Sequence, residues 1–300
     1  MERHIPVLVE TALEQLAPRP QDTIVDITVG GGGHAEHILR VMQGGTFVGI
    51  DADADVLRST EQRLLSRAPD THKHFLEGNF RNIVSLLHAI GVSHVDAIIA
   101  DLGWGSHHLT SGRGFSFTSN EVLNMCYGTK EGACSQTALD IVNSWREEDI
   151  ADVLTTYGEE RWARRIAKRI IVGRKEKPIV MTERLADIVS DAIPRRLHPR
   201  GKHPATKTFQ ALRIAVNDEI RTLETFLDSV PGIAKSESRL VVITFHSLED
   251  RVVKHTFSRW EQAGLGTRTK RALKPSDAEV AENRRARSAK LRTFTFFNQI

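Results

Sequence analysis

The sequence predicts an α/β protein in which a doubly wound, mostly parallel sheet is interrupted by an inserted helical domain. Two observations lead to this prediction. Four apolar, strand-like segments alternate with helical segments over residues 1–101, which is typical of a parallel sheet covered by helices on both faces. Helical periodicity then fills the middle of the chain, and a strand pattern returns near its end. We therefore expect residues 1–110 and 211–300 to form one discontinuous domain, and residues 111–210 to form the insert.

Composition indicates a globular protein rather than a secreted or membrane-spanning one. The chain has 300 residues, of which 40% are hydrophobic and 26% are charged, so it is long enough to bury a large core. Its start has no apolar leader, and no apolar run approaches the roughly 18 residues that a membrane span needs. We expect a cytoplasmic protein. Cys126 and Cys134 have no partners at zinc-like spacing, so we expect ordinary thiols and no metal site.

Charge is distributed unevenly along the chain. Residues 1–110 carry 8 Lys and Arg against 14 Asp and Glu, whereas the remainder carries 33 against 24. An acidic part joined to a basic part suits a polyanionic substrate that is brought to a small-molecule site. The alternative is simply an uneven solvated surface.

The first motif is a glycine-rich turn at residues 26–34, with the sequence DITVGGGGH. It joins an expected strand at residues 23–27 to an expected helix at residues 35–41. Glycines permit positive φ and let a ligand approach the main chain, and the free N–H groups of a helix start favour acceptor atoms. An ordinary tight turn does not need four glycines, so we predict a cofactor loop.

Two cofactor classes fit this loop. Gly30, Gly32 and Ala35 satisfy the degenerate dinucleotide pattern G-x-G-x-x-G/A. Asp51 ends the next strand, where an acid suits the ribose of either a dinucleotide or an adenosyl ligand. Asp26 favours S-adenosylmethionine, because a carboxylate before the glycines would repel a diphosphate but could pair with an ammonium group. NAD is the alternative.

Functional side chains recur at the ends of the predicted strands. After the first strand, we expect strands at residues 46–51, 74–77 and 95–101. The residues at or just after the four strand ends are Asp26, Asp51, Phe80 and Asp101. Ligands of open parallel sheets bind outside the carboxyl ends of the strands, so this set predicts one site at that edge.

Two glycine-rich, aromatic segments follow the fourth strand, at residues 102–109 and 113–117. They have no strand pattern, and we interpret them as a functional loop. Phe115 and Phe117 could stack on a base or anchor the loop in the core, and the core interpretation is favoured.

The expected insert is helical from about residue 137 to residue 194. Residues 144–147 read as a capping box, and Gly158 as a stop. The basic side chains after Gly158 are Arg161, Arg164, Arg165, Lys168 and Arg169. A basic helix is usually a solvated face, but this one leads to a basic loop at residues 198–204, which also allows nucleic-acid binding.

The last third of the chain should complete the sheet. We expect one long helix at residues 209–227 and buried strands at residues 239–245 and 291–297. Ser247 lies near His and Asp residues, but without a G-x-S-x-G elbow it suits a helix N-cap better than a hydrolase nucleophile. Residues 268–292 form a basic tail with 9 Lys and Arg against 3 acids.

Taken together, the motifs resemble the RsmH/MraW family, bacterial methyltransferases that act on cytosine N4 in 16S ribosomal RNA. The resemblance spans nearly the whole chain and rests on seven blocks in the same order. These blocks are residues 4–8, 26–34, 101–103 with 113–117, 157–160, 203–206 with 209–213, 245–251 and 287–292. No single block would suffice.

The resemblance implies a class I S-adenosylmethionine-dependent methyltransferase fold, Rossmann-like and doubly wound, with a helical insert. The cofactor contacts that it implies are Gly32, Gly33, His34, Asp51, Phe80, Asp101 and His108. Phe80 would pack near the adenine and Asp51 would hold the ribose hydroxyls. His108 stands where the family usually has glutamine.

The departures from the family pattern cluster near the expected substrate mouth. Trp104-Gly105 replaces a usual Val-Ser, and Asn124, Cys126 and Tyr127 replace the usual Asp, Arg and Met. Farther along the chain, Arg284 replaces a usual proline. Two alternatives therefore stay open: a divergent paralogue that acts on another RNA base, and a non-catalytic RNA-binding factor in ribosome assembly.

The expected reaction is attack by cytosine N4 on the methyl carbon of a sulfonium. Asp101 is the candidate catalytic residue, as an acceptor for an N4 proton, although it could instead only hold the cofactor. The candidate substrate-binding residues are Arg164, Arg165, Lys168, Phe115 and Asn124. The expected partner is small-subunit rRNA within an assembled or nearly assembled subunit, without membrane association.

Overall fold

The computed structural model describes residues 6–103, 111–128 and 134–297. The chain divides into two compact units, with residues 1–104 and 220–300 in unit 1 and residues 105–219 in unit 2. The boundary predicted after residue 210 falls nine residues before this division, within helix α10 (Thr206–Asn217), which contacts α7 (Glu147–Gly158) in unit 2.

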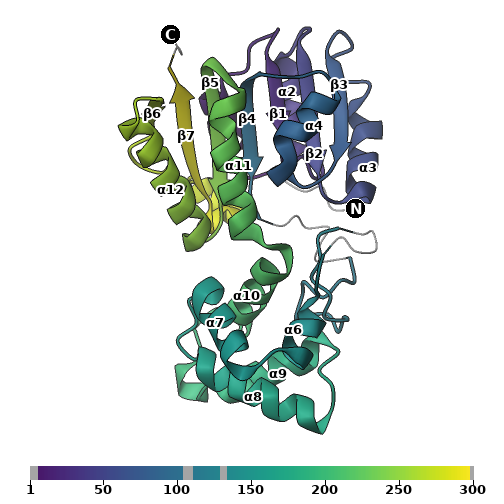
Figure 1. The fold of residues 1–300 in the computed structure, drawn as a ribbon, viewed down its shortest axis with the longest axis vertical. Coiled ribbons are helices and arrows are strands. Elements are labelled where there is room, and N and C mark those ends of the chain that lie inside the picture. The colour runs from purple at the N-terminus through teal and green to yellow at the C-terminus, as the bar shows by residue number, and fades with distance from the viewer. Residues whose placement is uncertain (1–5, 104–110, 129–133, 298–300) are drawn as a thin grey trace. The chain divides into compact units, whose positions relative to one another are not determined.

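Unit 1 contains a seven-stranded sheet in the order β3-β2-β1-β4-β5-β7-β6 (Figure 1). Strands β1 to β5 are parallel, whereas β7 is antiparallel to β5 and to β6. The strands are β1 Thr23–Asp26, β2 Thr46–Asp51, β3 His72–Glu77, β4 Val95–Asp101, β5 Ala234–Thr244, β6 Gly266–Arg268 and β7 Lys290–Phe296. The prediction of a doubly wound, mostly parallel sheet is confirmed.

Helices cover both faces of this sheet (Figure 1). Along β1, Ile24 packs into one apolar cluster and Val25 into the other, and both are fully buried. Burial on both faces explains why the strands read as continuous apolar runs. One face carries α1 Val9–Leu16, α2 Gly33–Val41 and α3 Ala54–Leu64, and the other carries α4 Ile83–Ala89, α11 Glu219–Ile233 and α12 Ser247–Gln262. Shorter elements are η1 Phe80–Asn82, α13 Asp277–Glu282 and η3 Arg284–Ser288.

The strand order reverses between β1 and β4, which are hydrogen-bonded neighbours. In open parallel sheets, this switch point leaves a crevice outside the carboxyl ends of the strands, where ligands bind. Asp26 ends β1 and Asp101 ends β4, so both carboxylates lie at that crevice. The strand order thus places two of the acids predicted from the sequence at the expected ligand site.

Unit 2 is helical and has its own apolar core. Its elements are α6 Ala138–Ser144, α7 Glu147–Gly158, α8 Ala163–Glu176, α9 Thr182–Ala192, η2 Arg195–Leu197 and α10 Thr206–Asn217. A bridge between Val122 and Met181 ties the segment before α6 to the start of α9. In the described part of the chain, no helix is long and apolar enough to span a lipid bilayer.

One helix predicted at residues 209–227 is in fact two. Asp218 takes the left-handed conformation, with φ 49°, and ends α10 before α11 begins at Glu219. Aspartate tolerates this conformation better than most residues, and the apolar spacing on either side conceals the break.

Two predicted helix caps are also wrong. α7 begins after Arg146 without a side-chain cap, and the capping box belongs instead to Thr137 and Asp140 at the start of α6. In α12 the N-cap is His246, whose ring accepts the Glu249 N–H while the Glu249 side chain accepts the His246 N–H. Ser247 is the first helical residue. The capping box thus lies seven residues before the predicted one, and the N-cap of α12 lies one residue before Ser247.

The expectation of two unpaired thiols is wrong as well. Cys126 and Cys134 form a disulfide, with Cα atoms 6.0 Å apart. Met125, with φ 61°, turns the chain just before Cys126, and the amide of Asn217 on α10 accepts the N–H of Tyr127. A separation of eight residues carries no signal for such a contact, because it depends on this local turn.

One buried ion pair joins the early and late parts of unit 1, and two further ion pairs lie within the late part. Asp22, before β1, pairs with Arg239 of β5 at 2.6 Å. Asp250 of α12 pairs with both Lys290 and Arg292 of β7 at 2.7 Å. Removing one partner of the Asp22–Arg239 pair would leave an uncompensated buried charge, so this contact commits the two chain segments to one domain.

Candidate active site

The glycine turn before α2 is held in shape by its own backbone and by α3. Gly30 and Gly32 have φ 46° and 72°, and Gly32 is the N-cap of α2. A Cβ on Gly32 would lie 2.7–2.9 Å from side-chain atoms of α3, so no larger residue fits there without movement. Thr60 of α3 donates to the Gly30 carbonyl at 2.6 Å. Sequence reasoning missed Thr60, because nothing in its surroundings marks a contact 30 residues away.

Asp51 links this turn to the end of β2. Its Oδ2 accepts the Gly30 N–H at 2.8 Å, and its Oδ1 accepts the Asp53 N–H at 2.8 Å. Burial raises the pKa of Asp51 to about 6, although these backbone hydrogen bonds act in the opposite direction. Each carboxylate oxygen has a second acceptor position, so Asp51 can hold the loop and a ligand hydroxyl together.

Asp26 lies deeper, at the end of β1, with 2% of its surface exposed. Its Oδ1 accepts the Thr28 N–H at 3.1 Å. Burial raises the pKa of Asp26 to about 7, and nearby Asp101 and Asp51 add to this effect while His34 opposes it. Asp26 therefore changes charge near neutral pH.

His34, on the first turn of α2, faces Asp101. Its Nε2 lies 3.5 Å from Oδ2 of Asp101, slightly longer than a normal hydrogen bond, and 5% of His34 is exposed. Burial alone would lower the pKa of His34, but Asp101 and Asp26 outweigh burial and raise it. Thr28 Oγ1 accepts the Asp101 N–H at 2.7 Å and fixes the end of β4. The motif around Asp26 therefore includes Thr28, which sequence reasoning did not single out.

The resulting cluster is rich in carboxylates and poor in cations. Asp26, Asp51 and Asp101 come from three neighbouring strands, and His34 supplies an imidazole beside Asp101 and Asp26. Among the described residues, no lysine or arginine forms an ion pair with these three carboxylates. A buried excess of negative charge is stabilised by a bound cation, so this geometry suits a positively charged ligand.

Phe80 starts η1, just after the end of β3, the strand that pairs with β2. Its ring meets Phe226 of α11 edge-on, with centroids 5.6 Å apart. The side chain is half-buried, so part of the ring stays accessible. Phe226 thus holds Phe80 in place where a planar ligand group could pack on it.

In unit 2, α8 displays the predicted basic residues on its solvent side. Arg164, Arg165 and Lys168 are all exposed, while Ile166, Ala167 and Ile170 are buried in the core. The guanidinium groups of Arg161 and Arg165 lie 5.0 and 6.0 Å from the centre of the Trp162 ring. Trp162 is a surface aromatic that sequence reasoning missed, although its place between arginines offered a signal.

The chain matches the model of the MraW methylase family over residues 1–297. It belongs to this family. Three similar relatives, each named ribosomal RNA small subunit methyltransferase H, come from Symbiobacterium thermophilum, Pelobacter propionicus and Geobacter sulfurreducens. They are 42%, 41% and 43% identical, over 96%, 97% and 96% of this chain and 95%, 97% and 97% of their own lengths. The predicted family is thus confirmed, and with it a methyltransferase that uses S-adenosylmethionine rather than NAD.

The MraW family residues predicted to contact the cofactor are brought together in unit 1 with one exception. Gly32 and Gly33 begin α2 beside His34, and Asp51 and Asp101 lie on neighbouring strand ends. The exception, His108, lies outside the described residues, as do Trp104 and Gly105.

The two predicted substrate residues before α6 have structural partners in this MraW protein. Phe115 is 7% exposed and stacks on Tyr127, with centroids 5.6 Å apart and planes 9° apart. This burial matches the core interpretation and leaves no free ring face for a base. Asn124 Oδ1 accepts the Cys126 N–H at 2.8 Å, so part of its amide supports the turn. We therefore no longer place Phe115 among the residues that contact substrate.

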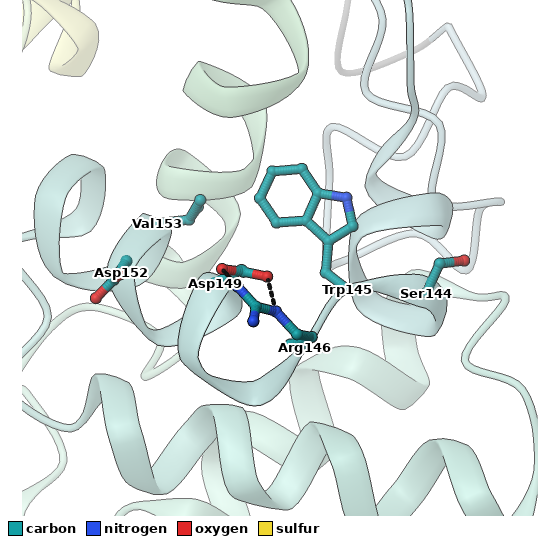
Figure 2. Close-up of a pocket in the computed structure, with 6 residues that line it drawn as sticks. All are labelled: Ser144, Trp145, Arg146, Asp149, Asp152 and Val153. Atoms are coloured by element: carbon teal, nitrogen blue, oxygen red, sulfur yellow. Dashed lines mark hydrogen bonds and ion pairs between the residues drawn. The ribbon is translucent and has the colours of Figure 1, made fainter.

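Unit 2 also has a surface depression of about 570 Å³, which Figure 2 shows. Its lining residues are Ser144, Trp145, Arg146, Asp149, Asp152 and Val153. Arg146 and Asp149 form a two-pronged ion pair across it, with N–O distances of 2.8 and 2.9 Å. None of these residues belongs to the predicted site, and the ion pair neutralises Arg146 and Asp149.

Proposed function

We propose that this MraW family member transfers a methyl group from S-adenosylmethionine to N4 of a cytidine in small-subunit rRNA, in the cytoplasm. The observation that carries the proposal is the buried cluster of Asp26, Asp51 and Asp101 with His34 at the switch point of the sheet. The relatives' shared name supports the choice of small-subunit rRNA as substrate.

The cluster fits the proposed cofactor on the chemistry of its own atoms. Nδ1 of His34 and Oδ1 of Asp101 are buried and have no hydrogen-bond partner in the described part of the protein, and Nε2 of His34 has only the 3.5 Å approach to Asp101. Buried polar atoms of this kind require a partner, and a ligand can supply it. S-adenosylmethionine carries an ammonium and a sulfonium, and when bound it supplies the activated methyl group.

Different residues would contact different parts of the cofactor. Asp26 would pair with the ammonium, and Asp51 would accept from the ribose hydroxyls. The backbone of Gly32 and Gly33 would lie against the methionine part, and Phe80 against the adenine. His108 joins this set by family resemblance alone.

Asp101 would face the reacting amine. N4 of cytosine is a weak nucleophile, because its lone pair is delocalised into the ring, and its N–H groups need an acceptor as positive charge develops. Oδ1 of Asp101 is buried and without a partner among the described residues, so it can serve as that acceptor. Alignment of the amine with the methyl carbon should supply much of the remaining rate.

Substrate binding is assigned to the basic side of α8 and to the polar segment before α6. Arg164, Arg165 and Lys168 would contact phosphates, and Asn124 would also contact the RNA. Phosphate contacts position RNA without reading its sequence, so the target is chosen by its structure. An assembled or nearly assembled small subunit presents such a structure, and we propose it as the substrate.

Methyl transfer from radiolabelled S-adenosylmethionine tests this function directly. Purified protein should label small subunits lacking the modification more than naked rRNA, and mass spectrometry of the digested rRNA should find the label on cytidine N4. Calorimetry should detect binding of S-adenosylhomocysteine but no binding of NAD. Label on another base would identify a divergent paralogue, and tight binding of cofactor and RNA without transfer would identify a non-catalytic assembly factor.

A further inference from the structure

The contact between His34 and Asp101 has features that a purely structural ion pair lacks. His34 Nε2 approaches Asp101 Oδ2 to 3.5 Å, while Oδ1 of the same carboxylate has no partner among the described residues. The surroundings of the two Asp101 oxygens thus differ: Oδ2 faces the imidazole, and Oδ1 is buried without a hydrogen-bond partner among the described residues.

No other described side chain orients this carboxylate. Thr28 Oγ1 accepts the backbone N–H of Asp101 but does not reach its side chain. The structural acids Asp22 and Asp250, by contrast, are held by arginine or lysine at 2.6–2.7 Å. A carboxylate with two rotatable bonds and no fixed partner would otherwise sample several orientations.

We infer that His34 is the positioning residue of the transfer step: its Nε2–H holds Oδ2 of Asp101 so that Oδ1 receives the proton released by N4. This inference rests on the function proposed above and adds a role for His34 beyond contact with the cofactor. His34 does not touch the reacting atoms. It acts through Asp101, as an orienting group acts through a catalytic base.

The step balances in charge and atoms. The N4 lone pair forms the new N–C bond as the C–S bond breaks, and the sulfur keeps the electron pair. N4 then carries a positive charge and gives one proton to Oδ1 of Asp101, which becomes a neutral carboxylic acid. That proton passes to water when the product leaves.

The 3.5 Å separation is compatible with this role. Catalytic hydrogen bonds are often long without ligands and shorten in the reacting complex. The titratable groups that face His34 are Asp26 from β1 and Asp101 from β4, with Asp51 from β2 acting on Asp26. Within its own helix, His37 turns its Nδ1 to the Gly33 carbonyl at 2.9 Å.

Three variants separate positioning from cofactor binding. His34→Gln keeps an N–H donor at about the same reach, whereas His34→Leu keeps volume and removes the donor. His37→Gln is the matched control on the same helix. Single-turnover transfer at saturating S-adenosylmethionine should slow by about 100-fold in His34→Leu, recover to within about tenfold of the parent in His34→Gln, and stay at the parental rate in His37→Gln.

Coupling to Asp101 is measured in two further ways. Adding His34→Leu to Asp101→Asn should slow transfer little beyond Asp101→Asn alone, because both changes disable the same pair. Without cofactor or RNA, NMR should show the pKa of the His34 ring falling in Asp101→Asn, with His37 unchanged. The NMR measurement tests the His34–Asp101 contact even if no rRNA substrate is methylated. Absence of methylation would reject the proposed function and not this contact.

The inference is overturned if folded His34→Leu transfers methyl groups at the parental rate. It is equally overturned if His34→Gln is as slow as His34→Leu, or if saturating cofactor restores the rate of His34→Leu, since His34 would then serve only cofactor binding. Circular dichroism and thermal unfolding of each variant separate these outcomes from a failure to fold.

Discussion

Asp51 is the residue on which both the loop and the proposed ribose contact depend. Asp51→Ala removes the acceptor of the Gly30 N–H and the acceptor for the ribose together. Loss of such charged hydrogen bonds costs about 1.5–3 kcal/mol, so the Kd for S-adenosylhomocysteine should rise by about 10–100-fold in calorimetry. Asp55→Ala, at an exposed position on α3, is the control. An unchanged affinity would remove Asp51 from the cofactor site.

Asp26 should make cofactor binding depend on pH. Its pKa of about 7 in the free protein means that a cationic ligand must displace a proton from it at lower pH. Between pH 6 and pH 8, the affinity for S-adenosylmethionine should therefore rise by about tenfold, with proton release measurable by calorimetry in buffers of different ionisation enthalpy. His34 acts in the same direction when it loses its proton. Asp26→Asn should bind more weakly and lose most of this dependence, and an undiminished slope would assign it to His34.

The same raised pKa affects stability, with a definite sign. The folded protein holds a proton on Asp26 more tightly than the unfolded chain does, since burial raises the folded pKa from 3.8 to about 7. The contribution of Asp26 to stability is thus fully present below the unfolded pKa and is lost as pH rises towards 7. A bound cation offsets this loss.

At this scale, the sequence predicted where the acids lie but not how they interact. Asp26, Asp51 and Asp101 were placed at one edge because parallel strands end together. The approach of His34 to Asp101 depends on how α2 is rotated, which residue spacing does not encode. Phe115 was left open between the core and a base, with the core favoured, because an aromatic side chain looks the same in sequence whether it stacks on a base or on Tyr127.

The exposed basic residues of helix α8 lead to a prediction about RNA binding. Replacing Arg164, Arg165 and Lys168 by glutamate should weaken binding to small-subunit rRNA, because phosphate contacts are lost. Each lost contact also lowers the salt dependence of binding. The slope of log K against log salt should fall by about 2–3, measured by filter binding from 50 to 200 mM salt. Lys254→Glu, exposed on α12, shows the effect of a single charge reversal away from α8. Equal binding and transfer at every salt concentration would exclude α8 from the RNA contact.

Strands were predicted better than helix ends. The bounds of β2 and β4 agree with the sequence pattern, because both are buried on two faces and bounded by turns. The three-residue edge strand β6 was missed, since so short a segment has no periodicity. The break at Asp218 was missed because a single left-handed residue leaves the apolar spacing intact.

For the whole molecule, the pair between Asp22 and Arg239 tests how the two segments of unit 1 are joined. Arg239→Ala leaves Asp22 buried without its cation and should lower the free energy of unfolding by about 3–5 kcal/mol in urea titrations. The double change Asp22→Ala with Arg239→Ala should cost less. Arg259→Ala breaks an exposed pair with Asp228 and should cost less than about 1 kcal/mol. Equal costs for Arg239→Ala and Arg259→Ala would contradict this account.

Family motifs were visible over the whole length of the chain, whereas the unit boundary was placed several residues early. Some of these motifs serve a local need that sequence alone can indicate, such as glycines in a turn and acids at strand ends. The boundary depends on which core α10 joins, and that is a property of packing between helices. The disulfide between Cys126 and Cys134 likewise depends on three-dimensional structure that residue spacing does not indicate.

The pairing of β4 with β5 has a consequence for synthesis on the ribosome. Asp101 and Ala234 are separated by about 130 residues, which a translating ribosome adds in roughly 7–27 s at the usual 5–20 residues per second. Through that interval β4, central in the finished sheet, is an open edge whose backbone groups can pair with another nascent chain. The insert thus sets a delay during which the emerging half-sheet is most exposed to aggregation, and folding of unit 2 occupies that delay.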